Sequence, residues 1–134
     1  MSQEKVDRIR AIMPPDGTDL SEVFVEGGGF STGGLVAEDA TVRFVAPNAE
    51  SEASGPEGFR ERWTDWLEPW ESYRIYTDDI VDRGDRVVVL TRLRGVTRRD
   101  HVEMEHEGAA VFHFDGDQVV QLEFNLDREA ALSG

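Results

Sequence analysis

The second half of the chain is a series of alternating segments joined by short turns, and this pattern restricts the possible folds most. Apolar and polar residues alternate with the period of a strand in each segment. The Asp115-Gly116 pair lies between two such segments and is a strong signal for a hairpin. The predicted strands cover residues 73–81, 86–94, 102–114 and 119–126. Together they predict an antiparallel meander.

Helices are predicted mainly before this meander. Residues 3–13 have apolar positions at three- and four-residue spacing and stop at Pro14-Pro15. Asp19 is a suitable cap for a second short helix, which would carry Leu20, Val23 and Phe24 on one side.

A third, long helix is predicted to begin at Pro56 and to end near Leu67 or Glu68, because Pro69 cannot continue it. Its apolar side is unusually aromatic. The residues expected on that side are Phe59, Trp63, Trp66, Leu67 and Trp70.

The segments between the helices are less regular. Residues 41–45 alternate and are predicted to form a short strand, whereas residues 48–55 are polar and are expected to be an exposed connection. Residues 26–34 contain five glycines, which predicts a mobile surface loop.

Helices followed by a meander predict one α+β domain over residues 1–134, with helices packed on a strongly curved antiparallel sheet. With 39% hydrophobic residues and no cysteine, the chain can form a core but has neither disulfides nor thiolate metal ligands. The net charge of −14 disfavours binding to nucleic acid or anionic membranes. No apolar stretch is long enough to span a membrane, and the polar residues 1–5 are not followed by an apolar signal core, so a cytoplasmic protein is expected.

The chain resembles SnoaL-like proteins of the NTF2-like superfamily over roughly residues 56–132. The resemblance is carried by four pieces in order: Gly58-Phe59-Arg60 with Trp63, Gly84–Leu90, Val111-Phe112 before Asp115–Asp117, and Phe124–Leu132. It implies a conical half-barrel around a cavity, often in a homodimer. The superfamily includes ketosteroid isomerases, limonene-epoxide-type hydrolases, polyketide cyclases and binding-only domains. The chain departs from the family pattern at residues 14–34, where glycine and proline replace two longer helices.

Alternation predicts which side chains face the cavity. Along residues 102–114 the odd positions include three glutamates, so the even positions are expected on the apolar, concave side. His106 is then the titratable group there, and imidazole is suited to acid–base chemistry near neutral pH. The expected ligand-binding residues are Trp63, Trp66, Ala110, Phe112, Leu122 and Phe124.

Arg92 and Arg94 have two possible orientations. The resemblance implies an inward Arg92, at the position of a cavity arginine of the hydrolases, and an inward pair would favour an anionic ligand. In this chain, however, Arg94 and Phe124 stand where those hydrolases carry aspartates. Simple alternation instead places both arginines outside, in ion pairs with Glu103 and Glu105.

The sequence thus leaves three kinds of function open. The first is a cofactor-independent isomerase or cyclase that uses His106 with help from Arg92 and Arg94. The second is a module that binds a small hydrophobic molecule without turnover, and the third is a dimeric interaction domain with a filled cavity. No metal site is predicted, because His101 and His113 lie on the strand face opposite His106, and no cofactor is expected.

Overall fold

The computed structural model describes residues 2–23, 35–46 and 49–133, and the structural statements below concern these residues. The predicted mobile segment, residues 26–34, lies outside these described residues. Among the described residues, no helix is long and apolar enough to cross a membrane.

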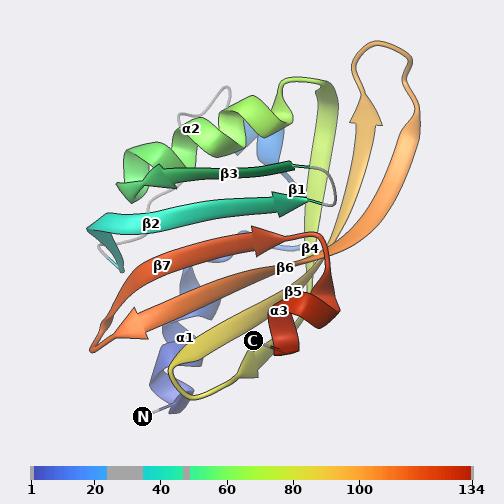
Figure 1. Cartoon of the computed structure of the whole chain (residues 1–134). Coiled ribbons are helices and arrows are strands. Elements are labelled where there is room, and N and C mark those ends of the chain that lie inside the picture. The colour runs from blue at the N-terminus through green and yellow to red at the C-terminus, as the bar shows by residue number, and fades with distance from the viewer. Residues whose placement is uncertain (1, 24–34, 47–48, 134) are drawn as a thin grey trace.

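One curved sheet of seven strands forms the body of the molecule, in the order β1-β4-β5-β6-β7-β2-β3 (Figure 1). The strands are β1 (Thr18–Asp19), β2 (Val36–Ala46), β3 (Ala49–Ser54), β4 (Trp70–Asp82), β5 (Arg86–Thr97), β6 (Glu103–Asp115) and β7 (Gln118–Asn125). The predicted meander is confirmed, because β4 to β7 pair with their neighbours in antiparallel register. The pairing of β2 with β7 is parallel and was not predicted.

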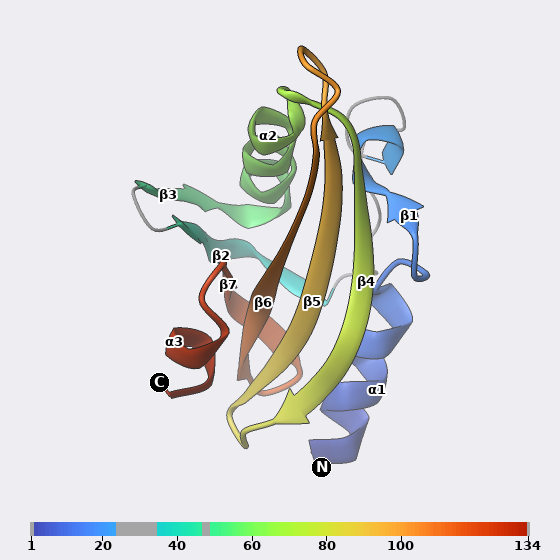
Figure 2. The ribbon, with the colours of Figure 1, turned by 90° about the vertical axis from the view of Figure 1, so that its right-hand side faces the viewer.

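The helices cover both faces of this sheet. They are α1 (Ser2–Ile12), α2 (Gly55–Leu67) and α3 (Arg128–Ser133). The main core lies on the concave side, where α1 and α2 meet the sheet, and it contains Val87, Val89 and Leu93 of β5. The short α3 packs on the opposite face, where Ala131 joins a second cluster with Val88 of β5 (Figures 1 and 2). The α+β architecture is therefore as predicted.

The ends of α2 follow from its sequence. The helix begins at Gly55, directly before Pro56, and ends at Leu67, two residues before Pro69, as predicted. Gly55 has a φ of +71°, and a Cβ atom there would lie 2.3 Å from the carbonyl oxygen of Glu38. Only glycine fits this start of the helix.

Trp70 was wrongly assigned to the apolar side of this helix. It is the first residue of β4 and is buried against Gly95 of β5, where a Cβ atom would lie only 2.4 Å from the Trp70 ring. Because Pro69 ends the helix, Trp70 contributes to the same core from a strand.

The predicted cap at Asp19 is confirmed. Its Oδ1 accepts hydrogen bonds from the backbone N–H of Ser21 (3.0 Å), from the Ser21 hydroxyl (2.7 Å) and from the backbone N–H of Tyr73 on β4 (3.0 Å). Burial alone would raise the pKa of Asp19, but these hydrogen bonds outweigh it and hold the pKa below its usual value. Residues 20–23 are helical, and Phe24 lies outside the described residues.

The prediction of an exposed connection over residues 48–55 is wrong for most of that segment. Ala49–Ser54 form β3, which pairs antiparallel with β2 at the edge of the sheet. Glutamate and serine have weak strand preference, so the segment carries little local signal. Pairing with β2, the strand that directly precedes it in the sequence, makes it a strand.

Candidate functional site

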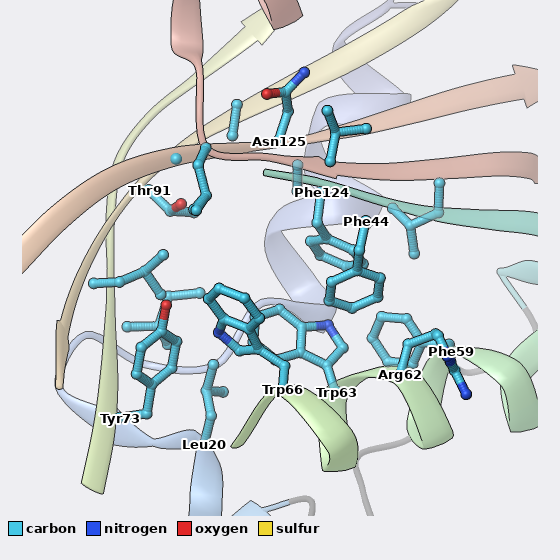
Figure 3. Close-up of a pocket in the computed structure, with 18 of the residues that line it drawn as sticks. Leu20, Phe44, Phe59, Arg62, Trp63, Trp66, Tyr73, Thr91, Phe124 and Asn125 are labelled. Atoms are coloured by element: carbon cyan, nitrogen blue, oxygen red, sulfur yellow. The ribbon is translucent and has the colours of Figure 1, made fainter. Parts of the chain in front are cut away.

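A cavity of about 310 Å³ lies between α2 and the concave face of the sheet. Its wall is mainly apolar and aromatic, and Figure 3 shows the side chains of α2 facing Phe44 of β2 and Phe124 of β7. The lining includes Ile12, Met13, Pro14, Leu20, Val36, Phe44, Val45, Glu50, Ser51, Phe59, Arg62, Trp63, Asp65, Trp66, Tyr73, Ile75, Thr91, Leu93, Gly108, Ala109, Ala110, Phe112, Leu122, Phe124, Asn125 and Leu126.

Helix α2 supplies the aromatic wall because Phe59, Trp63 and Trp66 recur at three- and four-residue spacing and therefore share one face. The ring of Trp63 lies edge-on to Phe124, with centroids 5.1 Å apart, and edge-on to Phe44 at 5.4 Å. Such contacts between α2, β2 and β7 fix the rings that surround the cavity. Trp63 and Trp66 both line it, as the sequence predicts for at least one of them.

Strands β6 and β7 supply the opposite wall. Ala110 pairs with Phe124 and Phe112 pairs with Leu122 across the two strands, and all four residues line the cavity. The alternation argument therefore assigns the correct face of these strands to the cavity. Their role in binding a ligand stays a prediction.

His106 lies beyond the cavity lining, and the structure connects it to the cavity through Tyr73. The Tyr73 hydroxyl is 2.5 Å from Nε2 of His106, and it also accepts a hydrogen bond from the indole of Trp66. Burial lowers the pKa of His106 and raises the pKa of Tyr73, so both groups are held in their neutral forms. Neutral His106, with its proton on Nδ1, can then accept a hydrogen bond from the Tyr73 hydroxyl at Nε2.

Arg92 and Arg94 point away from the cavity, which corrects their assignment as site residues. Arg94 forms ion pairs with Glu103 (3.4 Å) and Glu105 (3.0 Å) on the outer face of the sheet. Arg92 pairs with Asp78 (3.4 Å) and lies over the ring of Tyr76. Successive side chains of a strand point to opposite faces, so Arg92 and Arg94 share the face of β5 that is turned away from the cavity.

With the arginines outside, Thr91 and Leu93 are the residues of this strand that line the cavity. The inward orientation that the resemblance implied does not occur here, and neither arginine contributes to the proposals below.

The sequence analysis did not identify the residues of the cavity mouth. Glu50 and Ser51 come from β3, which was not predicted as a strand, and Arg62 and Asp65 come from α2. Arg62 forms an ion pair with Asp65 at 3.2 Å. The sequence analysis also did not name Thr91 as a site residue, although alternation along its strand predicts that the Thr91 side chain faces the cavity.

Metal binding has no support in the geometry. Within residues 2–23, 35–46 and 49–133, no group of three or more histidine, aspartate or glutamate side chains could hold a metal ion. His101, in the connection between β5 and β6, instead pairs with Glu71 at 3.0 Å.

Comparisons with solved structures agree with this architecture. An NTF2-like protein from Burkholderia thailandensis E264 is 18% identical, with a TM-score of 0.69 over 96% of this chain and 94% of that one. A putative SnoaL-like polyketide cyclase from Jannaschia sp. CCS1 is 16% identical, with a TM-score of 0.66 over 98% and 91%. TerC, co-crystallized with polyporic acid, is 13% identical, with a TM-score of 0.67 over 96% and 95%. At these identities the likeness shows a common fold.

The sequence comparisons give the family. No curated protein sequence matches the chain significantly. The model of the SnoaL-like domain matches residues 22–122, which is well over half of the chain and includes the long helix and most of the meander. Together with the NTF2-like fold, this match shows that the chain belongs to the SnoaL-like domain family.

Proposed function

We propose that this chain binds a small, largely apolar molecule in the cavity between α2 and the sheet. The observation that carries the proposal is the cavity of about 310 Å³ with its aromatic wall. Its volume is at the lower end of the roughly 300–1,000 Å³ of small-molecule sites. The co-crystallization of the structurally similar TerC with polyporic acid is consistent with this proposal.

An anionic group on the ligand would have to lie at the cavity mouth. Among the described residues that line the cavity, Arg62 is the one cationic side chain; its Nη2 pairs with Asp65, and its buried Nε has no hydrogen-bond partner. Glu50 is also at the mouth. The interior is therefore suited to an uncharged molecule, and the mouth could hold one anionic substituent beside Arg62.

The open cavity favours ligand binding over a purely structural domain, in which side chains would fill this space. The surroundings of His106 favour binding without turnover over catalysis. The partner that the structure gives His106 is the neutral Tyr73, and no carboxylate contacts it among the described residues. The carboxylates of the lining, Glu50 and Asp65, have exposed side chains.

Acid–base chemistry is our second candidate, and the Tyr73–His106 hydrogen bond is the observation that favours it. Tyr73 is completely buried in this structure, so a substrate would reach its hydroxyl only if Trp66 moved aside. An isomerase or cyclase of this kind would use the Tyr73 hydroxyl to donate a hydrogen bond to a substrate oxygen that gains negative charge, with neutral His106 in its Nε2–H tautomer donating to the Tyr73 oxygen. Loss of turnover in both Tyr73→Phe and His106→Gln would support it.

A homodimer and a cytoplasmic location are further proposals. Large apolar side chains that the described part of the chain exposes, Val102, Met104 and Val120, are suited to a contact with a second copy. Light scattering of the purified protein gives the oligomeric state directly.

The test of ligand binding is native mass spectrometry of protein purified without denaturation, followed by organic extraction and identification of any molecule released. We expect a bound molecule of low polarity in 1:1 ratio with the chain. Ala110→Trp protein, prepared in the same way, is the control because the new ring would occupy the cavity. An identical extract from both proteins would contradict the proposal.

A further inference from the structure

Among the described residues of the cavity wall, Thr91 is a polar side chain whose hydroxyl the fold itself does not use. Thr91 lies in the middle of β5 and is only 5% exposed. Its backbone oxygen accepts a hydrogen bond from Arg128 (2.6 Å). Its hydroxyl makes no hydrogen bond within the part of the chain that the structure describes. Because this oxygen is not among the fully buried unpaired atoms and Thr91 lines the cavity, the hydroxyl is accessible from the cavity.

Gly108 keeps this hydroxyl open to the cavity. It pairs with Thr91 across β5 and β6, and a Cβ atom at residue 108 would lie 3.4 Å from Oγ1 of Thr91 and 3.3 Å from the backbone oxygen of Asn125. The φ of Gly108 is not in the left-handed region, so the backbone does not require glycine here. What glycine provides is space beside the hydroxyl.

The surroundings of Thr91 favour an uncharged ligand group in the space beside its hydroxyl. Nearby lining residues, including Leu93, Ala110 and Leu126, are apolar. The charged lining residues, such as Arg62, belong to the more exposed mouth, and Figure 3 shows Thr91 and Arg62 on opposite sides of the aromatic cluster. A charged group at Thr91 would therefore be desolvated without a counter-ion.

We propose that the Thr91 hydroxyl is the polar anchor of the bound molecule, and that the ligand is a flat aromatic molecule with a neutral hydroxyl or carbonyl group at its inner end. A threonine hydroxyl both donates and accepts, so it can bind either group. The rings of Trp63 and Phe124 provide the aromatic faces. This inference rests on the proposed function, because it requires that the cavity holds a ligand.

The test compares 2-naphthol with 2-methylnaphthalene, in which a methyl group replaces the hydroxyl. Binding to the intact chain is measured through the fluorescence of Trp63 and Trp66 and by calorimetry. We expect the wild-type protein to bind 2-naphthol about five- to tenfold more tightly, as one hydrogen bond provides. Thr91→Val should remove this preference with little change for 2-methylnaphthalene, and Thr91→Ser should retain it.

Gly108→Ala is a second variant, because its methyl group would cover the hydroxyl without removing it. It should reduce the preference for 2-naphthol as Thr91→Val does. If both probes bind but the preference is the same in the wild type and in Thr91→Val, the anchor is refuted and the binding cavity stands. If neither probe binds the wild type, the proposed function fails, and the anchor fails with it.

Discussion

Ala110→Trp tests whether the space between α2 and the sheet is a binding cavity. Ala110 lies on β6 opposite Phe124 and its side chain faces the main core, so a larger ring would extend into the cavity. Its neighbour Ala109 is the matched control. Ala109 is also part of the cavity wall, but side chains alternate along β6, and that of Ala109 belongs to the cluster beneath α3 with Val88 and Ala131.

The two substitutions should differ in stability. An indole ring buries about 150–250 Å² of surface, which at roughly 25 cal/mol per Å² stabilises by up to about 4–6 kcal/mol. In the cavity this gain offsets the loss of rotamer freedom and any local strain, so we expect Ala110→Trp to change stability by less than about 1 kcal/mol. At Ala109 the layer is closed, and overpacking should cost about 1–3 kcal/mol or more.

Thermal unfolding and ligand titration separate these outcomes. For a chain of this length, about 1 kcal/mol corresponds to a shift in Tm of roughly 3–5 °C. Ala110→Trp should keep the wild-type Tm and lose the binding of 2-naphthol, whereas Ala109→Trp should lower the Tm and retain binding at temperatures where it is folded. Equal losses of Tm in both variants, or ligand binding by Ala110→Trp, would refute the reasoning.

Three further predictions concern stability. The folded pKa of Asp19 is lowered, so its stabilising contribution is present above the unfolded pKa near 3.9 and is lost as the pH falls through the folded value. Asp19→Asn should therefore make the free energy of unfolding, measured in urea, less dependent on pH below about pH 4. Burial lowers the folded pKa of His106, so the unfolded chain takes up this proton first and stability should fall as the pH drops below about 6.5. His106→Gln should remove that part of the pH dependence. Arg128→Ala removes the closer of the two donors to Asp78 and a donor to the carbonyl oxygens of Thr91 and Gly108, and should cost about 1–3 kcal/mol by chemical unfolding. Arg92→Ala removes only the longer, exposed pair with Asp78 and should cost about 0–1 kcal/mol.

The fold could be predicted where local sequence and long-range pairing agree. The hairpins of β4 to β7 have alternating strands and turn residues at their ends, and Pro69 limits α2 at the expected residue. Strand β3 was missed because Glu50 and Glu52 have weak strand preference and only pairing with β2 orders them. The parallel pairing of β2 with β7 was missed for a related reason, since these strands are joined through most of the chain rather than by a turn.

The cavity wall was predictable for the same reason as the meander. Period-two alternation assigns Ala110 and Phe112 to one face of β6, and a register error of one residue would have exchanged the faces. The same rule gives the outward direction of Arg92, which the comparison with hydrolases contradicted. For this strand the physical pattern in the chain's own sequence was the better guide to orientation.

The hydrogen bond between Tyr73 and His106 could not be predicted from alternation, because the two residues lie on strands that are not neighbours. Tyr73 is on β4 and His106 on β6, with β5 between them. The residue of β5 opposite Tyr73 is Gly95, and a Cβ atom there would lie 2.9 Å from the Tyr73 ring and 2.4 Å from the Trp70 ring.

The absence of a side chain at Gly95 therefore lets both rings lie across β5, and Tyr73 reaches the imidazole beyond it. Its hydroxyl finds an acceptor in His106 and a donor in Trp66, which explains how so large a polar residue can be completely buried. The Tyr73 hydroxyl therefore makes its hydrogen bonds with His106 and Trp66, within the protein. Thr91, whose neighbour Gly108 provides space on the cavity side instead, is the residue whose hydroxyl remains for a ligand.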